Sequence, residues 1–381
     1  MFVRIIPALF FLIFSLINTS HAESGNVPEP PKLEATQYLL IDFLSGTELA
    51  AKDPDKRIEP ASITKLMTAY ILYQELEKGN ISVDDRVIVS QKAWKMEGSR
   101  MFLEAGKKVP LGRMISGLII QSGNDSAIAL AEHIAGSEEN FVRKMNDEAA
   151  RLGMTNTNFV NVTGWPNPRH YMSARDIAIL TRTVISEYPE HYEMYKEKEY
   201  SYNGIKQYNR NKLLWHDKTV DGVKTGHTES AGYCLLASAQ RGSMRLISIV
   251  LGADSDKTRT NYSQQLLEYG FRFFETHKLY DANSVLTEAR VWKGTQSKVP
   301  TGILEDFYVT IPKGHYSQLK GLMEIHKSID APVKRGDVIG TAIIRDLDRI
   351  VLQKPLVAMD SVDAGGTWTN ISDTVKKVFV E

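Results

Sequence analysis

A serine and a lysine stand three residues apart at the start of an apolar run, in the stretch EPASITKLMTAY of residues 59–70. On a helix, Ser62 and Lys65 would share one face, with their Cβ atoms about 5–6 Å apart. A serine hydroxyl becomes a good nucleophile when a neighbouring base takes its proton, and a lysine can be that base if burial lowers its pKa. Apolar neighbours such as Leu66 and Met67 would provide the burial. The pair is therefore a candidate for acyl-transfer chemistry.

The same spacing also has an ordinary structural explanation. A serine is a common N-cap residue, and a lysine one turn later is usually solvated. Ser317 and Lys320 show the same spacing elsewhere in the chain. The serine–lysine pair therefore needs support from other motifs.

A second motif, Ser122-Gly123-Asn124, follows the apolar run MISGLIIQ. Its hydroxyl can relay a proton, and its amide can hold a substrate amide. The triplet Ser201-Tyr202-Asn203 has the same form, but Asn203 followed by glycine indicates a hairpin turn, which is sufficient to explain it.

A third motif, Lys224-Thr225-Gly226, comes just before the apolar stretch AGYCLLASA. A cation and a hydroxyl on a strand edge would suit a bound carboxylate. The glycine would let a substrate backbone approach closely. Taken alone, this triplet could also be an ordinary turn.

The elements that must position these motifs indicate an α+β domain. Residues 37–51 are typical of a hairpin with a turn at Ser45-Gly46, and a helix is expected from about 62 to 78. Helical patterns follow over 111–136 and 140–154. Residues 231–255 predict two strands around an Arg241-Gly242 turn, and another helix is expected over 261–277. Strands at both ends with helices between them predict an antiparallel sheet covered by a helical cluster.

The rest of the chain divides into a second domain and two terminal segments. A length of 381 residues favours two domains. We expect the first at 35–283 and a small all-β domain at 284–364, where short β-branched runs alternate with Gly, Pro and Asp. Residues 365–381 suggest an amphipathic helix that could lie in a membrane interface or dock on the β domain. Its apolar face would carry Trp368, Ile371, Val375, Val378 and Phe379.

Residues 1–22 predict a secretory signal peptide that is cut after Ala22. Arg4 provides the basic start, residues 5–17 form a short apolar segment, and Ser20-His21-Ala22 offers small residues for cleavage. An uncleaved anchor is the alternative, although a bilayer span needs about 20 apolar residues.

Composition excludes several classes of function. Lys plus Arg equal Asp plus Glu at 46 each, so the net charge does not suggest a nucleic-acid partner. Cys234 is the only cysteine, which rules out an intramolecular disulfide and a cysteine metal site; we interpret it as a small buried hydrophobe. The chain has no His-Glu-x-x-His motif, and we expect neither a metal nor a cofactor.

Together the three motifs resemble the active-site set of penicillin-binding proteins and serine β-lactamases. Longer stretches, including SGNDSAIALAEHIAG, YNRNKLLW and VDGVKTGHTESAGYCLLASA, are similar to the D-alanyl-D-alanine carboxypeptidases of the low-molecular-mass penicillin-binding protein 5 type. The resemblance covers most of residues 37–280, and the leader, β domain and tail also match in order. It implies a β-lactamase/DD-peptidase-like fold for the first domain.

The resemblance also implies a role for each matching residue. Ser62 would be the acylated nucleophile, Lys65 its general base and Ser122 a proton relay, while Asn124 would help to position the substrate. Lys224 would set the electrostatic field of the site, and Thr225 would meet the terminal carboxylate.

Further residues of the site follow from the same resemblance. Backbone NH groups of Ser62 and His227, the residue after Gly226, would form the oxyanion hole. The His227 imidazole as general base is an alternative. Arg210 in YNRNKLLW and Arg259 in DKTRTN match positions near the carboxylate pocket, although the surroundings of Arg259 differ from the family pattern and both could be ordinary surface arginines.

The implied function is removal of the terminal D-alanine from peptidoglycan stem pentapeptides, with penicillins as covalent inhibitors. The expected partners are the stem peptide, β-lactams and a membrane surface, and the expected location is the bacterial periplasm, at the outer face of the inner membrane. A β-lactamase is one alternative, although no Glu-x-x-Leu-Asn segment lies between Asn124 and Lys224. Endopeptidase or transpeptidase activity and a non-catalytic peptidoglycan-binding scaffold are the others.

Overall fold

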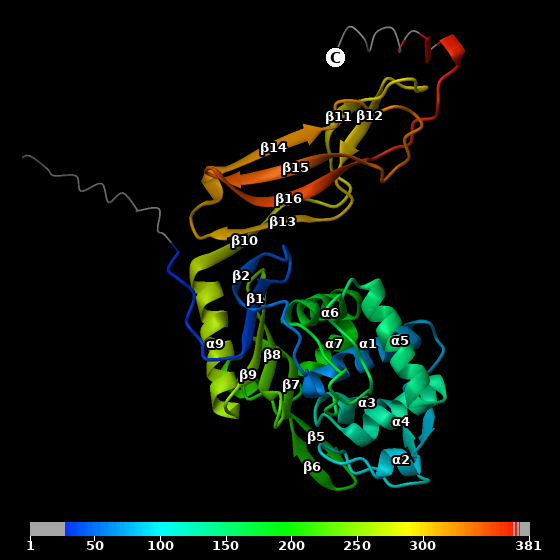
Figure 1. The fold of residues 1–381 in the computed structure, drawn as a ribbon, viewed down its shortest axis with the longest axis vertical. Helices are drawn as coiled ribbons and strands as arrows, with labels where there is room; N and C mark the ends of the chain where they lie inside the picture. The colour runs from blue at the N-terminus through cyan, green and yellow to red at the C-terminus, as the bar shows by residue number, and fades with distance from the viewer. Residues whose placement is uncertain (1–26, 369, 372, 374–381) are drawn as a thin grey trace, which may run out of the picture.

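The computed structural model describes residues 27–368, 370, 371 and 373. The expected signal peptide and most of the expected amphipathic tail lie outside these residues. Figure 1 shows two parts: a larger one that combines helices and strands, and an all-β module above it in the view.

A five-stranded antiparallel sheet forms the centre of the larger part. Its strand order is β2-β1-β9-β8-β7. The strands are β1 (Gln37–Asp42), β2 (Glu48–Lys52), β7 (Val220–Thr228), β8 (Gly232–Arg241) and β9 (Met244–Ala253). The first hairpin and the last strands meet through the pairing of β1 with β9. The sequence-based prediction of a sheet built from both ends of the domain is confirmed.

Both faces of this sheet are covered by helices. Successive side chains of a strand point to opposite faces, and accordingly Leu39 and Ile41 pack into the helical cluster whereas Leu40 packs against α9 (Asp256–Phe273). The cluster contains α1 (Lys65–Glu77), α2 (Gln91–Trp94), α3 (Leu111–Ile119), α4 (Asn124–Ala135), α5 (Glu138–Arg151), α6 (Ala174–Glu187) and α7 (Pro189–Tyr192). The short helix α8 (Leu213–His216) instead packs into the core on the α9 side. Short 3₁₀ turns add η1 (Ala61–Thr64) and η2 (Glu193–Lys196), and two small hairpins pair β3 (Arg86–Ile88) with β4 (Lys108–Pro110) and β5 (Glu199–Tyr202) with β6 (Ile205–Tyr208).

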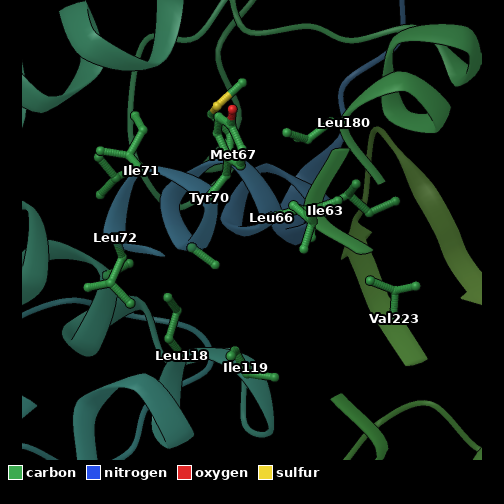
Figure 2. Close-up of a cluster of buried hydrophobic side chains, with 14 of the residues drawn as sticks. Ile63, Leu66, Met67, Tyr70, Ile71, Leu72, Leu118, Ile119, Leu180 and Val223 are labelled. Carbon is green, nitrogen blue, oxygen red and sulfur yellow. The ribbon is translucent and has the colours of Figure 1, made fainter. Parts of the chain in front are cut away.

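Helix α1 lies at the centre of the cluster. Ten of its 13 residues are buried, so it has no solvent-facing stripe of the usual kind. Figure 2 shows its apolar side chains between Leu118 and Ile119 at the end of α3, Leu180 of α6 and Val223 of β7. The element that follows Ser62 is therefore fixed from several sides.

Three expected elements differ in detail. The helix predicted from 62 begins as the 3₁₀ turn η1, which carries Ser62, and α1 starts at Lys65. The helical pattern of 111–136 is two helices, because Ser122 adopts φ 64° and interrupts it. The helix predicted over 261–277 ends at Phe273, and Phe274–Tyr280 forms strand β10.

The second part is all-β, as the sequence predicted. Strands β11 (Val285–Arg290), β12 (Lys298–Gly302), β16 (Arg349–Ala358), β15 (Val338–Asp346) and β14 (Leu319–Ile325) form one sheet in this order. Strand β10 pairs with β13 (Phe307–Pro312), and the turn η3 (Tyr316–Gln318) leads into β14. Apolar side chains of β13 pack against those of β15 and β16. β10, which we expected in the first domain, thus joins the sheet structure of this module.

A polar network connects the two parts. The buried Asp42 carboxylate accepts hydrogen bonds from Ser45 and from Thr276 Oγ1 of β10 (2.8 Å). Ser45 Oγ also lies 2.6 Å from Thr310 Oγ1 of β13. Because Ser45 belongs to the β1–β2 turn, this turn attaches the central sheet to the module.

Candidate active site

Ser62 and Lys65 are in direct contact. Lys65 Nζ donates hydrogen bonds to Ser62 Oγ (3.0 Å) and to the carbonyl oxygen of Thr163 (2.6 Å). The turn η1 makes this contact possible, because it places Ser62 at the N-terminal end of α1, one turn before Lys65, the first residue of the helix. The Ser317–Lys320 pair has no such geometry, since Ser317 lies in η3 and Lys320 in strand β14.

Lys65 is almost fully buried, and its side chain has an unusual proton affinity. Its pKa is lowered from 10.5 to about 7, mainly by burial and also by the positive charge of Arg210, while the Asp125 carboxylate opposes the shift. A lysine of this kind is partly neutral near pH 7, so it can accept a proton from a neighbouring hydroxyl. The sequence suggested the apolar burial but not the contribution of Arg210.

The carbonyl that holds Lys65 belongs to a turn that is organised by one side chain. Asn161 Oδ1 accepts hydrogen bonds from the backbone NH groups of Thr163, Gly164 and Trp165, and Asn161 Nδ2 donates to the Trp165 carbonyl. Gly164 has φ +83°, and a Cβ there would lie 1.7 Å from the Ala61 carbonyl oxygen. Only glycine fits between this turn and the backbone that carries Ser62.

The second and third motifs meet beside this pair. Lys224 Nζ of β7 donates to Ser122 Oγ at 2.7 Å, and both residues are buried. The pKa of Lys224 is lowered well below its usual value by burial, and also by the nearby charges of Lys65, Arg210 and Arg259. Three segments that are distant in sequence therefore converge, as the resemblance implied.

Ser122 lies in the break between α3 and α4, and Asn124 is the first residue of α4. Asn124 Nδ2 donates to the Glu97 carbonyl (2.7 Å), and the Asn124 backbone NH donates to the carbonyl of Ser99. The neighbouring Asp125 carboxylate accepts from the NH groups of Met101 and Leu103. These bonds fix the 97–103 segment against the start of α4.

The structure gives a reason for a glycine at position 226 that differs from the one we expected. We expected it to let a substrate backbone approach, but a Cβ at Gly226 would lie 2.9 Å from the Pro60 carbonyl oxygen and 3.2 Å from Ala61 Cβ. The glycine lets strand β7 pack closely against the segment that carries Ser62.

Arg259 lies behind β7 and not in the pocket. Its buried guanidinium donates to the carbonyls of Gly226 and Cys234, both at 3.0 Å, and pairs with Asp256. These contacts favour a role in holding β7 and β8 over the direct substrate contact expected from the sequence. Cys234 is buried and free, as expected.

A pocket of about 420 Å³ opens over Ser62. Its lining brings together Asn124, Arg210 and His227, all expected from the sequence. Thr225 lies beside it, nearly buried on β7. The lining also contains Gly98 and Ser99, which adjoin Asn124, together with Thr163, Gly164, Trp165, Pro166, Thr228 and Glu229.

His170 is a further residue of the site that no motif indicated. Its Nδ1 accepts a hydrogen bond from the Val160 NH (3.2 Å), so its Nε2 carries the proton and donates to Thr64 Oγ1 (2.8 Å). Burial and the charge of Lys65 lower its pKa to about 4. The neutral ring therefore ties the loop around residue 160 to the turn that carries Ser62.

Two family models together match most of the chain. The model of the D-alanyl-D-alanine carboxypeptidase family matches residues 24–255, and the model of the C-terminal domain of penicillin-binding protein 5 matches residues 274–364. The chain belongs to the D-alanyl-D-alanine carboxypeptidase family. It is a serine peptidase of that family. The expected family is confirmed, as is the expected fold class of a mixed domain followed by an all-β domain; the expected C-terminal helix stays a prediction.

Individual relatives of this family agree in sequence and in structure. The D-alanyl-D-alanine carboxypeptidase DacC of Escherichia coli is 42% identical over 375 residues, which cover 96% of this chain and 94% of the relative. The crystal structure of penicillin-binding protein 5 from Haemophilus influenzae is 41% identical and has a TM-score of 0.84 over 88% of this chain and 99% of that chain. An ampicillin-bound form of penicillin-binding protein D2 from Listeria monocytogenes is 28% identical, with a TM-score of 0.59 over 64% of this chain and 100% of that chain.

No helix in the described part of the chain is long and apolar enough to cross a membrane. Among the same residues, no group of three or more His, Cys, Asp or Glu side chains is arranged to hold a metal ion.

Proposed function

We propose that this carboxypeptidase removes the terminal D-alanine from peptidoglycan stem pentapeptides through an acyl-enzyme on Ser62. The observation that carries the proposal is the 3.0 Å contact between Ser62 Oγ and the amine of Lys65, whose pKa is about 7. A hydroxyl beside a partly neutral buried amine is an activated nucleophile.

In the acylation step, neutral Lys65 takes the Ser62 proton while Oγ attacks the carbonyl carbon between the two D-alanines. The Thr163 carbonyl accepts a hydrogen bond from Lys65 Nζ, which orients the nitrogen lone pair toward Ser62. The carbonyl oxygen becomes an oxyanion, for which the backbone NH groups of Ser62 and His227 are the proposed donors. Removal of one such donor typically costs about 100- to 1,000-fold in rate.

Collapse of the tetrahedral intermediate breaks the peptide bond, and the leaving D-alanine amine needs a proton. Ser122 is the proposed relay: its hydroxyl, which accepts from Lys224 Nζ at 2.7 Å, passes its own proton to the amine and takes up the proton that Lys65 received from Ser62, so Lys65 becomes neutral again. Water then attacks the ester carbonyl while neutral Lys65 takes a proton from that water. As the intermediate collapses and the shortened peptide leaves, Lys65 returns this proton to Ser62 Oγ, which regenerates the hydroxyl and the neutral amine.

The positive charges around the pocket fit a substrate that ends in a carboxylate. Arg210 lines the pocket, and Thr225 offers a hydroxyl on the adjacent edge strand. We assign Arg210 and Thr225 to the terminal carboxylate and Asn124 to a substrate amide. Arg259 is assigned an indirect role through its hydrogen bonds to the Gly226 and Cys234 carbonyls.

The proposal extends to inhibitors and location. A β-lactam would acylate the same Ser62, a view supported by the ampicillin-bound relative. We place the enzyme in the periplasm, at the outer face of the inner membrane, on the basis of the leader pattern and the amphipathic tail. Two residues of that tail, Trp368 and Ile371, are 85% and 55% exposed.

The decisive experiment measures D-alanine release from a peptide that ends in Lys-D-Ala-D-Ala, with Ser62→Ala as the control. Release by the wild-type chain only, together with covalent penicillin labelling that is lost in Ser62→Ala, is the expected result. Labelling retained by the folded Ser62→Ala variant would contradict the assignment of the nucleophile.

A further inference from the structure

Strand β14 forms an open edge of the β module. It is the last strand of the five-stranded sheet, and β15 is its only partner in that sheet. The five central residues, Lys320 to Glu324, are all exposed, and they include Leu322 at 48% and Met323 at 44%. In Figure 1, β14 lies on the side of the module that faces away from the catalytic part.

This edge lacks several of the features that usually protect an edge strand. Natural sheets block open edges with prolines, bulges, very short strands or charged side chains, particularly lysine; of these, only the charges of Lys320 and Glu324 occur in β14. Strand β14 has seven residues, contains no proline, and pairs with β15 without a register shift. Its free backbone groups can therefore accept another strand along its whole length.

The sequence of the strand, LKGLMEI, is complementary to itself when it runs antiparallel. With a two-fold axis through Leu322, Lys320 of each copy lies opposite Glu324 of the other copy, which gives two charge pairs. It also places Leu319 opposite Ile325. Shifting the register by two residues in either direction removes both charge pairs, so electrostatics selects this register.

The opposite face of the strand is complementary in shape. The same register places Met323 of the second copy opposite Gly321, and directly opposed residues share one face of a sheet. Gly321 borders a hollow of about 320 Å³ that is lined by Leu279, Tyr280, Tyr316, Leu319 and Ile344. A flexible methionine is well suited to fill an irregular apolar hollow of this kind.

The charges within one copy also favour an acidic neighbour. In the register of β14 with β15, Lys320 lies opposite Arg345. Two adjacent cations on one face repel each other, and a carboxylate on the open side of Lys320 would offset this. Glu324 of a second copy would provide that carboxylate.

We propose that two copies of this chain associate through antiparallel pairing of their β14 strands about Leu322, which joins the two β modules into one ten-stranded sheet. The catalytic parts then lie away from the contact, so both active sites stay open. A single seven-residue strand on each side makes a small interface, and the association is accordingly weak and concentration-dependent.

Cross-linking tests the register. Opposed Cα atoms in an antiparallel pair lie about 4.5–5.5 Å apart, within the range of a disulfide. Cys234 is buried and is the only native cysteine, so a single new cysteine reports on its own position. Leu322→Cys in the chain of residues 23–381 is expected to form a disulfide-linked dimer under mild oxidation at least tenfold faster than Val285→Cys, which places an equally exposed cysteine on the other edge strand, β11. Equal rates would overturn the proposal.

Charge reversal tests the complementarity. Lys320→Glu should raise the dimer dissociation constant measured by sedimentation velocity about tenfold or more, because two attractive pairs become repulsive. The double variant Lys320→Glu, Glu324→Lys restores both pairs with reversed polarity and should recover wild-type association. Unchanged penicillin labelling verifies that each variant is folded. A wild-type chain that stays monomeric at all concentrations, or a double variant that is no better than the single one, would refute the proposed pairing.

Discussion

The amine of Lys65 and the carbonyl oxygen of Thr163 lie 2.6 Å apart. This contact connects the proposed base to a turn that belongs to none of the three motifs, and Asn161 holds the turn through its side chain. The geometry of the base therefore depends on Asn161, although Lys65 donates its hydrogen bonds to Ser62 and Thr163.

Asn161→Ala is expected to reduce acylation by penicillin about 10- to 100-fold. The variant leaves the NH groups of Thr163, Gly164 and Trp165 without their common acceptor, and each lost hydrogen bond costs about 1 kcal/mol. Stopped-flow acylation measures the effect. Asn158→Ala serves as a control in the same loop, because Asn158 Nδ2 donates only to the Arg169 carbonyl. Similar rates in both variants would show that the turn does not position the base.

The acylation rate should depend on the protonation of Lys65. Only the neutral amine can take the Ser62 proton, so the rate should rise with pH and reach half its maximum near the pKa of about 7. Arg210 lowers this pKa through its charge, and Arg210→Gln should therefore move the rising limb to higher pH. The rate profile of penicillin acylation from pH 5 to 10 measures both effects; a limb at the same pH in both proteins would exclude Arg210 as a cause.

Gly164→Ala should nearly abolish acylation and lower the melting temperature. A Cβ at this position would overlap the Ala61 carbonyl oxygen at 1.7 Å and displace the turn that carries Ser62. Gly153→Ala is a matched control, because Gly153 also has positive φ (+74°) but no atom within 4 Å of an added Cβ. The control should lose only about 1 kcal/mol of stability through backbone strain. Equal losses of activity would mean that backbone strain alone, without the clash, explains the effect.

His170 should make the fold sensitive to acid. Its pKa is about 4 in the native state and 6.5 in an unfolded chain, so the unfolded state binds more protons between these values. The free energy of unfolding should therefore fall as the pH drops from about 6.5 to 4, by about 3 kcal/mol from this group. Urea unfolding at several pH values measures the slope, which His170→Gln should reduce. An identical slope in the variant would assign the acid sensitivity to other groups.

Local patterns in the sequence predicted much of the fold. The hairpin of 37–51 and the turn at Asn203-Gly204 depend on residues next to each other, and the structure has both. The end of α9 was missed because the stretch FRFFETH contains no glycine, proline or asparagine to mark a helix end, and its few apolar residues do not separate a helix from the strand that begins at Phe274.

The sequence predicted the residues of the site that belong to the three motifs. Ser62, Lys65, Ser122 and Lys224 were placed in one candidate site because their residue types and their order along the chain are informative. The structure has the contacts of Ser62 with Lys65 and of Ser122 with Lys224, and the catalytic roles of the four residues stay predictions. Asn161 and His170 act on the site through hydrogen bonds to backbone or hydroxyl groups, and such partners have no fixed spacing in sequence. The sequence indicated that Gly226 and Arg259 belong near the site, but not which residues they contact. Gly226 lies against the Pro60 carbonyl, and Arg259 donates to the Gly226 carbonyl. Both contacts depend on how β7 packs in the fold.

The pairing of β1 with β9 affects how the chain folds. Gln37–Asp42 hydrogen bonds with Leu246–Leu251, so more than 200 residues separate the partners. A growing polypeptide cannot complete the central sheet until residue 251 has been synthesised, and the segment between the two strands contains Ser62 and most of the helices. Closing such a long loop carries a large entropic cost before its contacts form. Assembly of the catalytic pocket is therefore a late, non-local event, and the nascent chain remains without activity until both ends of the domain are in place.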